Sequence, residues 1–206
     1  LQFKNDNPAI ISMVENGSPR VITHNQLYEE VVRLSTALKK IGIKKGDRVA
    51  GFLPNIPESI VAMLATTSLG AIWSSCSPDF GEKSVTDRFS QIEPKIIFSA
   101  NAYDYNGKRF NCLKKLNNIL KTLPSIEQVV IIDFLKIKID ITDVPNSIDY
   151  DLLIDIKADS MKFEHFPFDH PLYILYTSGT TGLPKSIVHG AGGTLLQHKK
   201  EMMLHC

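Results

Sequence analysis

The chain has 206 residues, with 23 lysines and arginines against 22 acidic residues and a net charge of +1. This length supports one sizeable hydrophobic core. The charges are balanced, without the basic excess that is typical of nucleic-acid binding. No apolar run reaches the roughly 18 residues that insertion into a membrane requires. Three irregularly spaced cysteines without a C-x-x-C pair predict a reducing compartment, for which the cytosol fits best.

The first predicted element is a helix that begins after Thr23, since Thr23 and Gln26 have the spacing of a capping box. Gly42 is expected to close it. Five apolar residues spaced three or four apart fall on one face of this helix: Leu27, Val31, Leu34, Leu38 and Ile41.

Strands and helices are then predicted to alternate along the chain. The predicted strands are residues 48–53, 71–74, 95–99 and 128–133, and the predicted helices follow Pro57 and lie near residues 84–91 and 111–121. Because the intervening segments have the length of crossover connections, the pattern predicts an α/β fold. We expect a doubly wound, mostly parallel sheet with helices on both faces.

The remainder of the chain is less regular. Residues 135–170 are predicted to be a connector with a short helix around residues 150–156, because a structureless loop of that length is unusual within a compact domain. We therefore expect a first α/β unit over residues 1–134, the connector over 135–170, and the start of a second unit over 171–206.

A loop rich in hydroxyl side chains and glycine runs from Tyr176 to Lys185, directly after the apolar residues 172–175. Glycine lets backbone N–H groups approach oxyanions closely, serine and threonine add donors, and lysine adds positive charge. The loop therefore predicts a binding site for the phosphates of ATP. The residues assigned to it are Thr177, Ser178, Gly179, Thr180, Thr181, Gly182 and Lys185.

The glycine spacing separates this loop from the P-loop of phosphotransferases. Only two residues separate Gly179 from Gly182, and Leu183 and Pro184 precede the lysine. Residues 186–189 are a short stretch around the β-branched Ile187 and Val188 and end at Gly190, which predicts a second strand and hence a hairpin. A P-loop phosphotransferase stays an alternative that a helix after Lys185 would favour.

The ten residues Tyr176 to Lys185 resemble the signature of adenylate-forming enzymes: acyl-CoA synthetases, luciferases and the adenylation domains of peptide synthetases. Residues 70–81, 87–95 and 187–198 extend the resemblance and are most similar to the acyl-CoA synthetases that activate acetoacetate, with acetyl- and propionyl-CoA synthetases next. The resemblance implies a reaction of acetoacetate, ATP with Mg²⁺, and CoA, through an acyl-adenylate with release of pyrophosphate.

The resemblance also implies where CoA binds. Lys108 and Arg109 match the region that meets the CoA phosphate in acetyl-type relatives, and Gly81 lies where the pantetheine arm passes. The alternative for Lys108 and Arg109 is a solvated turn centred on Asn106 and Gly107.

Relatives in this family are roughly three times longer, so the chain is expected to be a fragment of the large N-terminal AMP-binding domain. The resemblance places the adenine and ribose motifs and the adenylation lysine outside it, leaving Lys185 to anchor the loop or touch phosphate. No catalytic residue and no protein-bound metal are then expected within the chain, which would not turn over alone. A non-catalytic nucleotide-binding module is a further alternative.

Overall fold

The computed structural model describes residues 4–15, 17–137, 140–158, 160–161, 163–177 and 182–205. The strands are β1 (Pro8–Ser12), β2 (Arg20–Thr23), β3 (Arg48–Phe52), β4 (Ile72–Cys76), β5 (Ile96–Ala100), β6 (Ala102–Tyr105), β7 (Lys108–Asn111), β8 (Gln128–Ile132), β9 (Ser147–Asp149), β10 (Pro171–Tyr176) and β11 (Ser186–Gly190). The helices are α1 (His24–Lys40), α2 (Pro57–Ser68), α3 (Glu82–Phe89), α4 (Leu113–Leu120), α5 (Tyr150–Ile154) and α6 (Ala191–Leu204).

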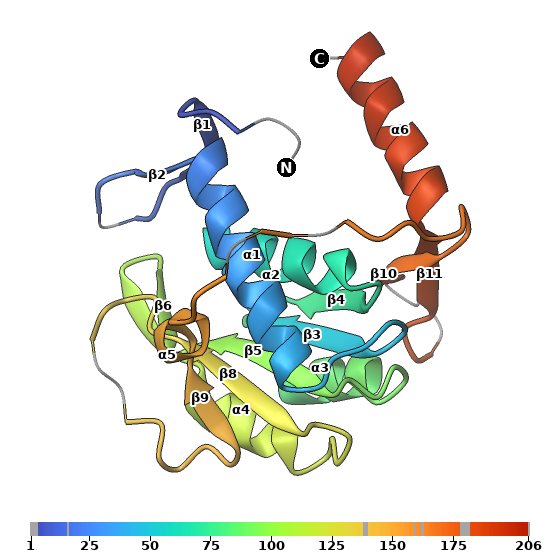
Figure 1. The fold of residues 1–206 in the computed structure, drawn as a ribbon. Helices are drawn as coiled ribbons and strands as arrows, with labels where there is room; N and C mark the ends of the chain where they lie inside the picture. The colour runs from blue at the N-terminus through green and yellow to red at the C-terminus, as the bar shows by residue number, and fades with distance from the viewer. Residues whose placement is uncertain are drawn as a thin grey trace.

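Seven strands form one central sheet in the order β11-β10-β4-β3-β5-β8-β9 (Figure 1). All neighbours in it run parallel except β10 and β11, which form an antiparallel hairpin at one edge. Two antiparallel pairs, β1 with β2 and β6 with β7, lie outside this sheet. The predicted mostly parallel sheet is confirmed.

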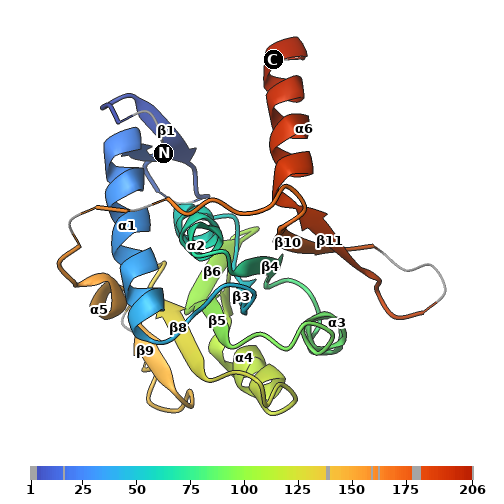
Figure 2. The ribbon, with the colours of Figure 1, turned by 45° about the vertical axis from the view of Figure 1, so that its right-hand side comes forward.

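Helices cover both faces of the sheet, with α1, α2 and α5 on one side and α3 and α4 on the other (Figure 2). Successive strand residues point to opposite faces, so that Val49 of β3 joins the core beneath α1 and α2 while Ala50 joins the core beneath α3 and α4. Both residues are completely buried. The predicted doubly wound arrangement is therefore also confirmed.

The N-terminal end of α1 has the predicted capping box. Thr23 Oγ1 accepts the Gln26 N–H at 3.2 Å, and Gln26 Oε1 accepts the Thr23 N–H at 2.9 Å. After the helix, Gly42 has φ +98°, a conformation that favours glycine. Both end signals of this helix are thus confirmed. Four of the five predicted apolar positions, Leu27, Val31, Leu34 and Leu38, are buried, whereas Ile41 follows the last helical residue and is 40% exposed.

Five strands were not predicted: β1, β2, β6, β7 and β9. Their residues are mostly exposed or half-buried, unlike the buried apolar runs of β5 and β8, so no apolar run marks them in the sequence, and β9 exists through its parallel pairing with β8. The predicted short helix of the connector is α5. The division of the chain at residues 134 and 170 stays a prediction, although β9 and β10 both belong to the central sheet.

Helix α6 follows β11 and extends away from the sheet (Figures 1 and 2). Its apolar side chains are largely exposed, among them Leu195, Leu196 and Met203. None of the helices in the described part of the chain is both long and apolar enough to cross a bilayer.

Candidate functional site

The hydroxyl-rich loop connects β10 to β11, as the sequence predicted. Tyr176 is the last residue of β10 and pairs with Ser186, the first residue of β11. Thr177, Gly182 and Lys185 lie in the connection between the strands. The other four predicted phosphate-binding residues, Ser178, Gly179, Thr180 and Thr181, lie outside the described residues.

Two hydrogen bonds between Thr177 and Lys185 close the neck of this loop. The Thr177 N–H donates to the Lys185 carbonyl at 3.1 Å, and the Lys185 N–H donates to Thr177 Oγ1 at 3.3 Å. The Lys185 side chain is exposed. The first and last loop residues are thereby held side by side, while the ammonium group stays available to an anion.

Tyr176 fastens the end of β10 to α3. Its hydroxyl donates to the Arg88 carbonyl at 3.1 Å and lies 3.3 Å from the hydroxyl of Ser74, which donates to the Ile174 carbonyl. The Arg88 guanidinium carbon lies 5.7 Å from the centre of the tyrosine ring. Burial raises the pKa of the Tyr176 phenol to about 12, so the group stays a neutral donor at physiological pH.

Gln91, in the turn after α3, holds the other side of the loop. Its Nε2 donates to the Pro184 carbonyl at 2.9 Å, and its Oε1 accepts the Ser186 hydroxyl at 2.7 Å. Sequence reasoning gave neither Gln91 nor Tyr176 a role. Two features of the sequence could have pointed to them: Tyr176 is the first residue of the loop motif, and Gln91 lies within residues 87–95, which carry the same family resemblance.

The segment after Lys185 is the strand β11 and not a helix. A P-loop needs a helix at this point, whose N-terminal N–H groups face the phosphates. The P-loop alternative is therefore not supported.

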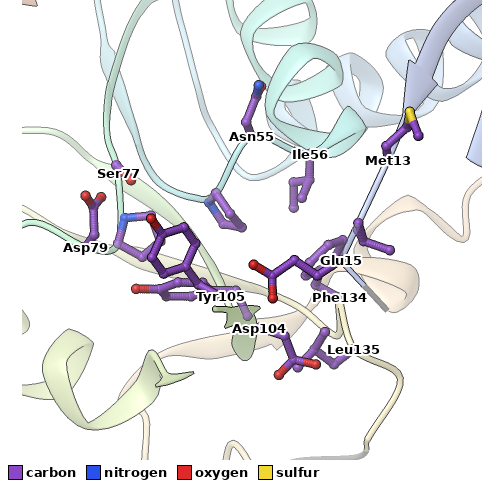
Figure 3. Close-up of a pocket in the computed structure, with 14 residues that line it drawn as sticks. Met13, Glu15, Asn55, Ile56, Ser77, Asp79, Asp104, Tyr105, Phe134 and Leu135 are labelled. Atoms are coloured by element: carbon purple, nitrogen blue, oxygen red, sulfur yellow. The ribbon is translucent and has the colours of Figure 1, made fainter. Parts of the chain in front are cut away.

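A second feature is a pocket of about 500 Å³ at the carboxyl edge of the sheet (Figure 3). It lies at the point where the chain order reverses, between the loops that follow β3 and β5, which is where open α/β sheets commonly bind ligands. Its walls come from the loops after β1, β3, β4 and β8 and from the strand β6. The fourteen lining residues are Met13, Val14, Glu15, Pro54, Asn55, Ile56, Ser77, Pro78, Asp79, Tyr103, Asp104, Tyr105, Phe134 and Leu135.

The pocket walls are aromatic and acidic. Three aromatic rings, from Tyr103, Tyr105 and Phe134, offer flat apolar surface. The carboxylates of Glu15, Asp79 and Asp104 line it too, and none of its fourteen lining residues is a lysine or an arginine. Among the residues that the structure describes, no three His, Cys, Asp or Glu side chains gather in a group that could hold a metal ion.

Lys108 and Arg109 lie beside this pocket, at the start of β7. Asp104 in the pocket wall accepts two hydrogen bonds from Arg109, to Nε at 2.9 Å and to Nη2 at 3.1 Å. The hydrogen bond from Arg109 lowers the pKa of the Asp104 carboxyl. Asn106 and Gly107 have φ +50° and +69° and form the turn between β6 and β7, so the turn that the sequence offered as an alternative exists, while a CoA contact of Lys108 or Arg109 stays a prediction.

Gly81 precedes α3, in the loop that follows the pocket residue Asp79. It is exposed, its φ is −64°, and an added Cβ would meet no atom within 4 Å. Lys115 holds this loop, because its Nζ donates to the carbonyls of Pro78 at 2.7 Å and Phe80 at 3.0 Å. Neither backbone strain nor lack of space therefore explains a glycine at position 81.

The predicted site residues thus form two groups at the same edge of the sheet. The loop residues follow β10, which is parallel to β4, whereas Lys108 and Arg109 belong to the ribbon that follows β5, on the other side of β3. Gly81 lies in the segment between β4 and α3, the helix to which the β10–β11 hairpin is fastened.

Comparison with known proteins agrees with the family resemblance of residues 176–185. Residues 2–203 match the family described as AMP-binding enzyme. Acetoacetyl-CoA synthetase of Mus musculus is 46% identical over 100% of this chain and 32% of its own length. Malonamoyl-CoA synthetase vrtB of Penicillium aethiopicum is 45% identical over 95% of this chain and 28% of its own length.

A solved structure, acetoacetyl-CoA synthetase from Streptomyces lividans, has the same fold. It superimposes with a TM-score of 0.91 at 40% sequence identity, over 98% of this chain and 30% of that protein. The chain therefore spans about a third of the length of the relatives that it matches.

Proposed function

Because the chain belongs to the AMP-binding enzyme family, we propose that it forms part of an ATP-dependent acid–thiol ligase that activates acetoacetate and transfers the acyl group to CoA. The observation that carries this proposal is the β10–β11 hairpin, whose loop holds the complete ten-residue motif and is closed at its neck by Thr177 and Lys185. Since the chain spans a third of its relatives, the activity is that of the whole protein.

The first step is attack of a carboxylate oxygen on the α-phosphorus of ATP. The bond from this phosphorus to the bridging oxygen of pyrophosphate breaks, and the product is a mixed anhydride of the acid and AMP. The barrier comes largely from charge on phosphate oxygens, which prearranged N–H and hydroxyl donors stabilise. We propose Thr177, Ser178, Gly179, Thr180, Thr181 and Gly182 as these donors. Mg²⁺ is proposed to arrive with ATP and to neutralise phosphate charge.

Lys185 is proposed to act in two ways. Its backbone closes the loop through Thr177, and its exposed ammonium faces the solution from which the phosphates enter. The adenylation lysine itself is expected elsewhere in the whole protein, so we assign no catalytic residue within these 206 residues.

In the second step, the CoA thiol attacks the carbonyl carbon of the acyl-adenylate and AMP leaves. We propose that CoA approaches along the carboxyl edge of the sheet, with its phosphates near Lys108 and Arg109 and its pantetheine arm near Gly81. Arg109 is already held by Asp104, whereas Lys108 is exposed in the strand beside it. Lys108 is therefore the better candidate for a phosphate contact, as a point charge and not a bidentate fork.

The acid substrate is proposed to be a short 3-carbonyl carboxylate. Acetoacetate and malonamate, the acids that the names of the two relatives indicate, both carry a carbonyl group two carbons from the carboxylate and differ only in a methyl against an amino group. Acetate and propionate lack that carbonyl, so a site that donates a hydrogen bond to it would reject them. Because acetate and propionate lack this carbonyl, we rank acetyl- or propionyl-CoA synthesis second, after acetoacetyl-CoA synthesis.

The test is carboxylate-dependent release of pyrophosphate from ATP by the complete gene product, with acetoacetate, malonamate, acetate, propionate and butyrate. We expect acetoacetate to give the highest kcat/KM and malonamate to be next. Highest activity with acetate would favour the second candidate, and no pyrophosphate with any carboxylate would favour a non-catalytic module.

The location and partners follow from the same proposal. We propose a cytosolic protein that acts on small molecules, binds no nucleic acid and does not insert into a membrane, since the charges are balanced and Cys76 and Cys112 are buried free thiols.

A further inference from the structure

The β6–β7 ribbon lies outside the central sheet and is fastened to it at its base. Asn101 is 1% exposed; its Oδ1 accepts the Ala102 N–H at 2.7 Å, its Nδ2 donates to Asp133, and its carbonyl accepts the Cys112 N–H at 3.0 Å. A two-stranded ribbon is only marginally stable by itself. The base contacts fix where the ribbon begins but not the direction in which its tip points.

The tip of the ribbon is held by Glu15, about 90 residues earlier in the sequence. One carboxylate oxygen accepts the N–H of Asn106 at 2.7 Å, and the other accepts the N–H of Gly107 at 3.2 Å. Hydrogen bonds to an ionised acceptor are roughly twice as strong as neutral ones. Glu15 follows β1 in the chain and lines the 500 Å³ pocket together with Asp104 and Tyr105 of the ribbon (Figure 3), so the ribbon tip is tied to a segment that shares this pocket.

We propose that Glu15 is a positioning residue that fixes the tip of the β6–β7 ribbon and thereby sets where Lys108 and Arg109 stand. These residues directly follow the turn that Glu15 grips, and Tyr103 and Tyr105 of the same ribbon form part of the pocket wall. The expected effect of Glu15 on CoA binding rests on the proposed function, whereas its expected effect on the position of the ribbon does not.

The experiment compares Glu15→Ala and Glu15→Gln with Glu127→Gln as a matched control, in the complete gene product. Glu127 is also exposed and lies in the loop before β8. Two readouts are taken: amide hydrogen exchange in the peptide spanning residues 103–110, and KM for CoA. Thermal unfolding checks that the variants are folded.

For Glu15→Ala we expect about tenfold faster exchange of the turn amides and a KM for CoA raised about five- to tenfold, with the midpoint of thermal unfolding unchanged. Glu15→Gln, which keeps one acceptor oxygen without charge, should fall between Glu15→Ala and the wild type. Glu127→Gln should change none of these values.

Unchanged exchange at the turn would overturn the proposal, because Glu15 would then not hold the ribbon. A lower KM for CoA in Glu15→Gln would also overturn it, since the carboxylate would then be repelling the anionic substrate. The CoA site and the hold of Glu15 on the ribbon are tested separately. If Lys108 and Arg109 do not contact CoA, the double variant Lys108→Ala with Arg109→Ala leaves KM for CoA unchanged. The exchange result for the Glu15 variants still decides whether Glu15 holds the tip of the ribbon.

Discussion

The hydroxyl of Ser186 donates to Gln91 Oε1 at 2.7 Å, although the two residues are 95 positions apart in the sequence. Gln91 also donates to the carbonyl of Pro184, so one side chain grips both residues that flank Lys185. Through this contact the turn after α3 sets the position of the loop that we propose for the ATP phosphates.

Replacing Gln91 with alanine is therefore expected to loosen the loop without unfolding the protein. The variant loses the bonds to Pro184 and Ser186 and a third from Nε2 to the Asp87 carbonyl; because all three are exposed, we expect a net loss of about 1 kcal/mol in holding the loop and a KM for ATP raised about fivefold. Steady-state kinetics with varied ATP measure this. Gln197→Ala is the control, because the Gln197 side chain bonds to Glu201 within α6 and to no other residue that the structure describes. An unchanged KM in Gln91→Ala would mean that the loop does not depend on α3.

Thr177 offers a sharper test of the loop itself. Thr177→Val keeps the side-chain shape but removes the oxygen that accepts the Lys185 N–H, whereas Thr177→Ser keeps that oxygen. We expect kcat/KM for ATP to fall about 10- to 100-fold in the valine variant, equivalent to about 1.4–3 kcal/mol of transition-state stabilisation, and much less in the serine variant. Equal activity of the two variants would exclude a role for the hydroxyl.

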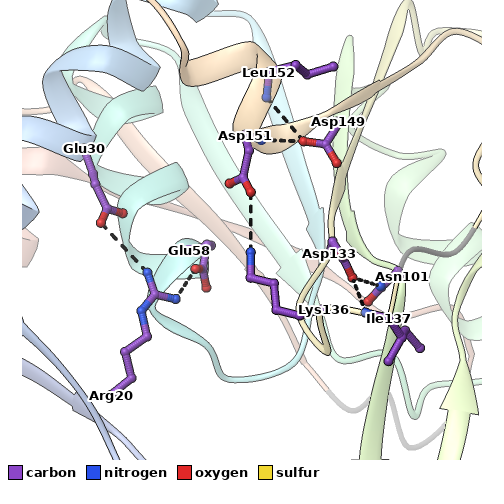
Figure 4. Close-up of polar contacts among 10 residues, drawn as sticks. All are labelled: Arg20, Glu30, Glu58, Asn101, Asp133, Lys136, Ile137, Asp149, Asp151 and Leu152. Carbon is purple, nitrogen blue, oxygen red and sulfur yellow. Dashed lines mark hydrogen bonds and ion pairs between the residues drawn. The ribbon is translucent and has the colours of Figure 1, made fainter.

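A charged cluster away from the sheet edge governs stability (Figure 4). Arg20 on β2 pairs with Glu58 at the start of α2, whose side chain is only 9% exposed, and lies 3.9 Å from Glu30 on α1. Arg20→Met leaves the Glu58 carboxylate buried without its partner, which we expect to lower the free energy of unfolding in urea by about 2 kcal/mol. The loss is smaller than for a fully buried pair because the Arg20 side chain is half exposed.

The double variant Arg20→Met with Glu58→Gln supplies the control for this pair. It removes the unpaired charge and should recover more than half of the lost stability. No recovery would show that the alkyl chain of Arg20, and not its charge, stabilises the contact between β2 and α2.

Glu30 makes the stability depend on pH. Burial raises the pKa of its carboxyl, and the neighbouring Arg20 charge opposes this only in part. Because the pKa of Glu30 is higher in the folded than in the unfolded state, its contribution to the free energy of unfolding is fully present below the unfolded pKa near 4.5. That contribution is lost as the pH rises through the folded pKa.

Glu30→Gln should therefore be more stable than the wild type at pH 7 and equally stable at or below pH 4. Urea unfolding at the two pH values measures the difference. A Glu30→Gln variant that is less stable at pH 7 would show that attraction to Arg20 exceeds the cost of burial.

The two described cysteines should be unreactive in the folded protein. Burial raises the pKa of the thiols of Cys76 and Cys112 to about 12, so very little thiolate forms at pH 8. We expect iodoacetamide to label both residues only after addition of denaturant, as measured by peptide mass spectrometry. Rapid labelling of Cys112 in the native protein would indicate opening of the base of the β6–β7 ribbon.

Local patterns in the sequence predicted most of the central fold. The capping box at Thr23, the alternation of strands and helices, and the β10–β11 hairpin each depend on residues close together in the chain, and all three are present. The Asn106–Gly107 turn was also readable, because a hairpin of this kind needs positive φ at both positions.

The contacts that hold the candidate site could not be predicted in this way. Glu15 and the Asn106 turn, or Gln91 and Ser186, meet only because distant segments pack at one edge of the sheet. Neither glutamate nor glutamine has a pattern around it that indicates its partner. Short strands such as β9 likewise exist through pairing with a neighbour and not through their own composition.

We propose that this chain belongs to an enzyme that joins a carboxylate to the α-phosphate of ATP. The most direct measurement uses acetoacetate labelled with ¹⁸O in its carboxylate, together with ATP, Mg²⁺, CoA and the complete gene product. If the acyl-adenylate forms and CoA attacks its carbonyl carbon, one labelled oxygen stays on phosphorus, and mass spectrometry should find AMP heavier by one ¹⁸O. Unlabelled AMP, or ADP as the nucleotide product, would contradict the account.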